Sequence, residues 1–245
     1  MACDRIVGEI DVNLSTITKI GIAEQATRLA EPFTMVDLAQ IDDLALSVFW
    51  CEGTMPFHRH LDQDELFLPY SGTIRIESDW GNLTLRPGDA TVVPKGVGHR
   101  SSSLLRSLVL LIQARTMISR RNGHRRLFAL KAEQGLPKIN VPAAGREMAA
   151  DFQPATLVDV DTFALTLTVC QGMGPRRQVD EQSSLVLCYQ GQVRLEGEFG
   201  RLVLHDGELA VVPRSTPYQL SSPARSLVLG VQRHPHPDPV PPGKP

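Results

Sequence analysis

The segment "GTIRIESDWGNLTLRPGDATVVP", residues 72–94, recurs in altered form as "GQVRLEGEFGRLVLHDGELAVVP", residues 191–213. The second copy starts 119 positions after the first, and the two align without a gap. The similarity extends outward in both directions, so that 24 of 60 positions are identical between residues 51–110 and 170–229. A repeat of this length, present twice, predicts two tandem domains rather than a solenoid.

Each copy is made of short runs such as "TIRIES" and "LTLRPGD", which are separated by Gly, Pro, Asp and Asn. Alternating apolar and polar residues are typical of half-buried strands, and closely spaced turn signals indicate an antiparallel sandwich or barrel. We therefore expect an all-β fold with a few short helices. The segments that best fit a helix are residues 23–30 and residues 125–134.

The repeat also sets the expected domain boundaries. They are an N-terminal arm (1–35), a first barrel (36–115), a connector (116–154), a second barrel (155–232) and a Pro-rich tail (233–245).

Composition restricts the class of partner. The 245 residues carry a formal net charge of −2, which argues against nucleic acid or an anionic membrane as the main partner. There is no run of 18 apolar residues and no apolar segment after a basic start, so we expect a cytoplasmic protein. The four cysteines show no CxxC spacing and are expected to be buried thiols in a reducing compartment.

The stretch "FHRHLDQDELFLPYSG", residues 57–72, contains the candidate chemistry of the first copy. On a strand, His58 and His60 would point to the same side, because alternate residues share a face. Glu65 follows after a short turn, and His99 comes later, at the end of "PKGVGH". Three imidazoles and one carboxylate suit a divalent first-row metal with open coordination positions. An HxH pair taken alone could equally be a surface pair or a satisfied core pair.

The spacing around these residues is more specific. It follows G-x4-H-x-H-x4-E-x6-G from Gly53 to Gly72, and G-x5-P-x-G-x2-H from Gly88 to His99. These frames resemble the two motifs of the cupin superfamily, and the whole chain is similar to a bicupin. The match has one residue fewer than usual between Gly53 and His58, and Ser103 stands where the family often has Asn.

The resemblance implies that each repeat is a jelly-roll (double-stranded β-helix) barrel. It implies a metal site in the first barrel, with Fe, Mn, Ni or Zn as the cofactor and four ligands: His58, His60, Glu65 and His99. Asp64 is the alternative carboxylate, although the spacing to Gly72 selects Glu65. No other cofactor-binding residue and no catalytic residue is identified, since Glu77, Asp89 and Tyr70 are merely nearby in the sequence.

The second copy lacks all four of these side chains. His58 is replaced by Arg177, His60 by Val179, Glu65 by Ser184 and His99 by Tyr218. This barrel could serve as a purely structural domain. Alternatively, Arg177 could inherit the inward orientation of His58 and pair with Glu181 or with a small anion, because a buried charge needs a partner.

The resemblance implies a metal-dependent enzyme that acts on a small chelating oxygenated substrate in the first barrel. The reaction would be dioxygenase-like, or that of a Lewis-acid isomerase or decarboxylase. The alternative is a bicupin that binds or senses a small molecule without turnover, because a fold does not dictate an activity. Exposed strand edges make a homodimer a further expectation.

Overall fold

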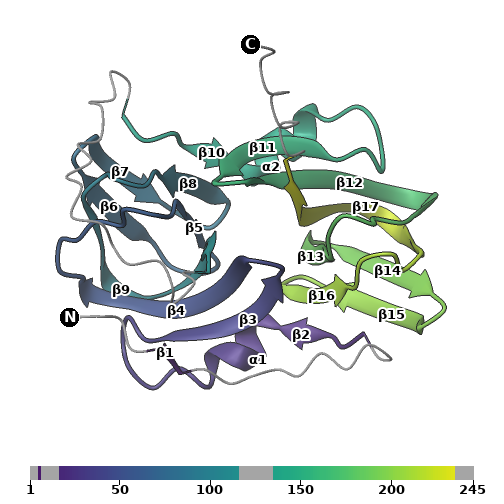
Figure 1. Cartoon of the computed structure of the whole chain (residues 1–245), viewed down its shortest axis with the longest axis horizontal. Helices are drawn as coiled ribbons and strands as arrows, with labels where there is room; N and C mark the ends of the chain where they lie inside the picture. Colours follow the sequence, from purple (N-terminus) through teal and green to yellow (C-terminus); the bar gives the residue numbers. More distant parts are fainter. Residues whose placement is uncertain (1–4, 7–16, 116–134, 235–245) are drawn as a thin grey trace, which may run out of the picture.

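The computed structural model describes residues 5–6, 17–115 and 135–234. Two β-barrels lie side by side, the first drawn mainly in purple to teal and the second mainly in green to yellow (Figure 1). The strands of the first barrel are β1 (Arg5–Ile6), β3 (Met35–Ile41), β4 (Leu44–Thr54), β5 (Glu65–Pro69), β6 (Ile74–Ser78), β7 (Gly81–Leu85), β8 (Asp89–Val93), β9 (His99–Ala114) and β10 (Ile139–Asn140).

The second barrel repeats this arrangement. Its strands are β2 (Ile20–Gly21), β11 (Ala155–Val160), β12 (Phe163–Arg177), β13 (Ser184–Gln190), β14 (Gln192–Gly197), β15 (Gly200–His205), β16 (Glu208–Val212) and β17 (Tyr218–Arg233). Two short helices accompany the sheets in the described part of the chain, α1 (Ile22–Ala26) and α2 (Val141–Glu147).

One long strand organises each barrel. β9 pairs with β4 along nearly its whole length, with β6 near its start and with β5 near its end. β17 pairs in the same way with β12, β14 and β13. The register keeps the offset of the repeat, since Phe49 lies opposite Val109 and Thr168 lies opposite Val228. The predicted all-β fold of two tandem barrels is confirmed.

The central strands are buried on both faces. In β4, Leu46 and Val48 contribute to a core that the two barrels share, whereas Phe49 and Cys51 face the interior of the first barrel. β13 behaves likewise, with Leu185 in the shared core and Val186 inside the second barrel. Strands covered on both sides give continuous apolar runs instead of alternation. The apolar core therefore joins the barrels as well as filling them.

Polar contacts at the strand turns reinforce this junction. The Asp64 carboxylate accepts hydrogen bonds from the backbone N–H groups of Lys95 (2.9 Å) and Asp161 (2.8 Å), and Asp161 belongs to the second barrel. From that barrel, the Arg233 guanidinium donates to the Asp43 carboxylate of the first. The N-terminal arm adds a strand to the opposite barrel, since β2 pairs with β16.

The helices differ from the sequence expectation. Residues 23–30 were expected to be helical, but α1 ends at Ala26 because the next three amides, those of residues 27–29, bond to carbonyls only three residues back. α2 was not predicted, since Pro142 and Gly145 make its sequence a poor helix former. It is capped by Asn140, whose side chain accepts a hydrogen bond from the Ala143 amide. The helix expected over 125–134 lies outside the described residues.

No helix in the described segments is long and apolar enough to cross a membrane. The cysteines in these segments, Cys51, Cys170 and Cys188, are free and buried, as expected. Cys3 falls outside them.

Candidate metal centre

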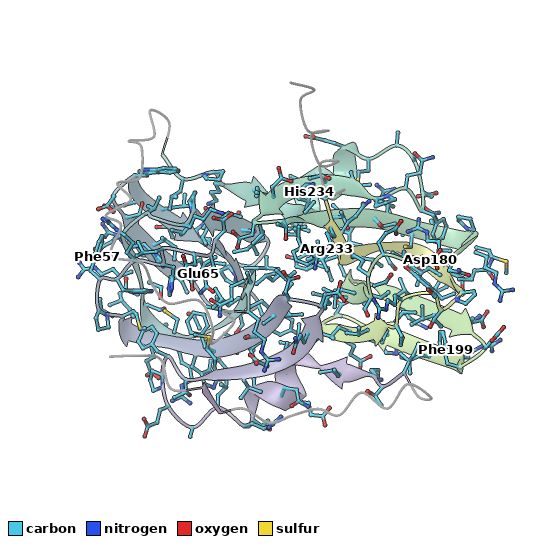
Figure 2. All side chains as sticks on the ribbon, in the orientation of Figure 1. Phe57, Glu65, Asp180, Phe199, Arg233 and His234 are labelled. Carbon is cyan, nitrogen blue, oxygen red and sulfur yellow. The ribbon has the colours of Figure 1, made fainter. Side chains whose placement is uncertain are left out.

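Four side chains from three parts of the first barrel converge. Glu65 is the first residue of β5 and His99 the first of β9, while His58 and His60 lie on the extended segment between β4 and β5. One possible ligand atom from each lies within 4.8 Å of the others. Glu65 lies among the strands of the first barrel, and Phe57 lies at the outer end of that barrel (Figure 2). The four residues singled out in the sequence are thus brought together.

Backbone hydrogen bonds hold the two histidine segments against each other. The His58 amide donates to the His99 carbonyl (2.9 Å), and the His99 amide donates back to the His58 carbonyl (2.8 Å). The Gly96 amide donates to the His60 carbonyl at 2.7 Å. Gly96 has a φ of +83°, a conformation that glycine adopts without steric cost, which explains its place in the "PKGVGH" turn.

Two imidazole rings are oriented by backbone carbonyls. His58 Nδ1 lies 2.9 Å from the Pro56 oxygen, and His99 Nδ1 lies 3.2 Å from the Val97 oxygen. Each Nδ1–H therefore donates to its carbonyl, so Nε2 is the nitrogen of each ring that would bind a metal, in place of any proton it carries. Phe67 packs edge-on against the His99 ring, with centroids 5.9 Å apart, and limits its rotation.

Glu65 supplies the negative charge of the cluster. Its Oε1 lies 3.3 Å from His60 Nε2 and its Oε2 lies 2.8 Å from His99 Nε2, and the side chain is 5% exposed. Burial by itself would raise the pKa of Glu65. The hydrogen bond with His99 and the charges of the three histidines outweigh burial and hold the pKa below its usual value. One carboxylate and three imidazoles form a donor set that fits a divalent transition metal.

The cluster opens on one side. The side chains of Glu65 and His99 are almost completely buried, whereas His60 is 32% exposed and His58 is half-buried. Phe57 stands 53% exposed beside this opening. A Cβ at Gly98 would lie 2.6 Å from the Phe57 ring, so glycine lets the ring lie across this turn.

Comparison with known proteins agrees with this architecture. No family model matches the chain. An uncharacterised protein, YdbB of Bacillus subtilis (strain 168), is 29% identical over 97 residues, which is 38% of this chain and 86% of that protein. A cupin 2 conserved barrel domain protein from Leptotrichia buccalis has a TM-score of 0.68 at 12% identity, covering 92% of this chain and 100% of that one.

This chain has the bicupin fold. A second solved structure with the same fold is salicylate 1,2-dioxygenase from Pseudaminobacter salicylatoxidans. It has a TM-score of 0.67 at 12% identity and covers 89% of this chain and 84% of that one. At this identity, the likeness establishes the arrangement of two barrels and leaves the chemistry to the residues of this chain.

Asp64 does not join the cluster. Both of its carboxylate oxygens accept backbone hydrogen bonds at the junction between the barrels. The other groups close in sequence are also engaged elsewhere. Glu77 pairs with Arg75 and Arg100, Asp89 pairs with Lys138, and Tyr70 lies against Gly207 of the second barrel.

Part of the support around the candidate metal site could not be predicted from the sequence. The Asp79 carboxylate accepts hydrogen bonds from the Gly98 amide (2.8 Å) and the Arg59 guanidinium (2.9 Å), so it ties the two histidine segments together. Asp79 is 20 positions from Arg59 and matches no motif, so only the hairpin between β6 and β7 reveals its role. Ser103 bonds the carbonyls of Thr73 and Leu105, as Ser222 does with the equivalent carbonyls, which is a structural role.

Within the described residues, the second barrel has no equivalent cluster. In the part of the chain that the structure describes, the first-barrel residues are the only group of three or more His, Cys, Asp or Glu side chains placed to hold a metal. Arg177 pairs in register with Tyr218, as His58 does with His99. The second barrel therefore keeps the strand pairing of the first and lacks the side chains that could bind a metal.

Proposed function

We propose that the first barrel binds a divalent transition metal through His58, His60, Glu65 and His99 and uses it in catalysis. The observation that carries this proposal is the convergence of four ligand atoms within 4.8 Å, two of them on rings whose Nδ1 atoms face backbone carbonyls. Fe, Mn, Ni and Zn all accept such a donor set, so the ion has to be identified by measurement.

The buried and the exposed residues around the cluster would have different roles. Glu65 offsets two charges of a divalent ion only in part, so the centre keeps a net positive charge that attracts an anionic or chelating oxygen donor. Glu65 and His99 lie at the buried base, so a substrate would approach past His60 and Phe57. When bound, the metal supplies a Lewis acid and, if it is redox-active, a site for oxygen chemistry.

The substrate class follows from this opening. A small oxygenated molecule with two neighbouring oxygen donors could occupy adjacent open positions while its body lies against Phe57. The likeness of fold to salicylate 1,2-dioxygenase supports an aromatic substrate of this kind. We propose a dioxygenase-like reaction first, and a Lewis-acid isomerisation or decarboxylation second.

A non-catalytic binding or sensing role is the alternative function. The observation that favours it is that Glu77, Asp89 and Tyr70 are all engaged away from the cluster, which leaves none of them as a general base. A reaction that needs no protein base, such as oxygenation of a chelated substrate, is compatible with this arrangement, whereas proton-transfer chemistry is disfavoured.

The test combines metal content with oxygen uptake. Protein purified without chelators is analysed for metal by elemental analysis and EPR, and oxygen consumption is measured with salicylate, gentisate, catechol, a β-diketone and oxalate. We expect about one metal per chain and oxygen uptake with at least one aromatic substrate. Stoichiometric metal without turnover of any compound would favour the binding role, and the absence of metal binding would overturn the proposal.

A further inference from the structure

The second barrel contains a cavity of about 860 Å³. Its walls come from β12, β13 and β17, and its interior residues include Thr166, Thr168, Ser184, Val186, Tyr218 and Val228. The cavity opens to solvent, since the exposed residues Gln178 and Glu181 also line it, and its volume lies within the roughly 300–1,000 Å³ of small-molecule sites. The barrel that lost its metal-binding residues has therefore kept a space large enough for a ligand.

Smaller side chains account for this space. The strand register matches the two barrels position by position, and it shows three large apolar side chains of the first interior replaced by small ones in the second. Phe49 is replaced by Thr168, Phe67 by Val186 and Leu111 by Gly230. Phe49, Phe67 and Leu111 pack together in one apolar cluster inside the first barrel. A domain that acted only as a scaffold would gain stability by filling this volume.

The cavity wall carries buried hydroxyl groups. Thr166, Thr168, Ser184 and Tyr218 are each less than a tenth exposed. None of these four hydroxyls hydrogen-bonds to another residue within the described segments of the chain. Polar groups in such positions normally find a partner, so the hydroxyls are available to a ligand that enters the cavity. Val186, Leu220 and Val228 provide apolar surface beside them.

Arg177 adds charge to the same space. It is half-buried, lines the cavity and lies opposite Tyr218 in register. Burial raises the pKa of Cys170 to about 12, and the Arg177 charge opposes that rise, which agrees with a guanidinium directed toward the barrel interior. In the described residues Arg177 forms no ion pair, not even with Glu181, which also lines the cavity.

The other charges around the cavity leave a positive balance. Arg176 lines it as well and has no ion pair within the described segments. Arg233 is engaged by Asp42 and Asp43 of the first barrel, and His234 pairs with Asp159 at 3.1 Å. Two guanidinium groups without an ion pair in the described segments, the exposed Arg176 and the half-buried Arg177, thus line the cavity together with one carboxylate, that of Glu181. A guanidinium fork matches a planar carboxylate in two parallel hydrogen bonds.

We propose that the second barrel is a metal-independent binding site for a small organic carboxylate with an apolar or aromatic body. The carboxylate pairs with Arg177, the Tyr218 and Ser184 hydroxyls complete its hydrogen bonds, and the body lies against Val186, Leu220 and Val228. This inference does not depend on the metal centre of the first barrel, because no residue is shared between the two sites.

Benzoate is a suitable probe, with benzamide as its uncharged counterpart and inorganic phosphate as an anion without an apolar body. Titration calorimetry is performed on the full chain, both metal-loaded and after chelation. We expect benzoate to bind with a Kd of about 1 mM or tighter, and the two comparison compounds to bind at least about tenfold more weakly. Binding should be equal with and without metal.

Three variants locate the bound probe. Arg177→Gln should weaken benzoate binding about 10- to 100-fold, as expected for losing a charged hydrogen bond. Arg194→Gln, an exposed arginine of the same barrel that does not line the cavity, should have no effect. Thr168→Phe should abolish binding by restoring the bulk of Phe49, while circular dichroism and metal content stay unchanged.

Three results would overturn the inference. The first is no benzoate binding by the wild-type protein at millimolar concentration, and the second is unchanged benzoate affinity in Arg177→Gln. The third is binding that disappears on chelation and in His60→Ala, which would place the probe at the first barrel. Because the third result needs a working metal centre, it also separates this inference from the function proposed for that centre.

Discussion

At the scale of single residues, two neighbouring carboxylates, Asp64 and Glu65, have different roles. Glu65 points into the first barrel among three histidines, whereas Asp64 points outward and binds two backbone amides at the junction between the barrels. The direction of each carboxylate follows from the strand period, because adjacent residues point to opposite faces. The same alternation places Leu66 in the shared core and Phe67 under His99.

A matched pair of substitutions tests this division. Glu65→Gln removes the only carboxylate of the cluster and should lower metal affinity by more than the about 10- to 100-fold that the loss of an outer partner costs. Asp64→Asn should leave metal content near that of the wild type. Metal per chain and the competition Kd are measured for both variants. A normal metal content in Glu65→Gln together with loss in Asp64→Asn would reverse the assignment.

At the scale of elements, the short strand β10 closes the edge of the first barrel. β10 pairs with β8, and Asn140 bonds both the Asp89 carboxylate (3.0 Å) and the first turn of α2. Lys138 adds an ion pair to Asp89 at 2.9 Å. Asp89 thereby links strand β8, strand β10 and the cap of the following helix.

This link predicts a pH-dependent contribution to stability. Burial would raise the pKa of Asp89, but hydrogen bonds from Asn140, Lys138 and the Arg86 amide together hold the pKa below its usual value. A carboxyl whose pKa is lowered on folding stabilises the protein above the pKa of the unfolded chain, and the effect is lost as the pH falls through the folded value. We expect Asp89→Asn to cost about 1–3 kcal/mol at pH 7.

Urea unfolding of the wild type and of Asp89→Asn from pH 7 down to pH 3 measures this effect. The difference in the free energy of unfolding should shrink as the pH falls below about 4. Asp62→Asn, at an exposed position of the loop before β5, serves as the control and should change stability by less than about 0.5 kcal/mol at every pH. A difference for Asp89→Asn that stays constant with pH would contradict the role given to its charge.

At the scale of the whole molecule, the two barrels are joined by close contacts as well as by the shared core. Gly207 has a φ of +75°, and a Cβ there would lie 2.3 Å from the Tyr70 hydroxyl of the other barrel. Burial raises the pKa of Tyr70, and the nearby Asp206 and Glu208 raise it further, which places its phenol against the loop of the second barrel.

Gly207→Ala tests this contact. Gly172 is the matched control, because its φ of +77° is similar but a Cβ there would have no atom within 4 Å. Gly172→Ala should cost about 1–2 kcal/mol from backbone strain alone. Gly207→Ala should cost more, measured by urea unfolding, and the excess should disappear when Tyr70 is replaced by Ala. Equal costs for the two glycine variants would show that the barrels do not meet at this point.

Homodimerisation through an exposed strand edge stays a prediction at this scale. Sedimentation velocity of the full chain tests it directly, since a dimer has twice the 26.9 kDa mass of the chain.

The sequence alone determined the two-barrel fold and the four residues that converge in the first barrel. The fold follows from the repeat, the strand period and the turn glycines, and the four residues follow from the resemblance of their spacing to the cupin motifs. The sequence also showed that Arg177 and Tyr218 replace two of those residues, without showing what the second barrel does with them.

Only the tertiary structure decided the rest. The helix α2, the hydrogen bonds of Asp79, the backbone partners of Asp64 and the cavity at Arg177 all depend on segments that are distant along the chain and meet only when the sheets close. A cavity is the clearest case, because its volume is set by side chains from three strands together. None of the three small residues Thr168, Val186 and Gly230 by itself indicates the cavity in the sequence, because packing is a property of the assembled interior.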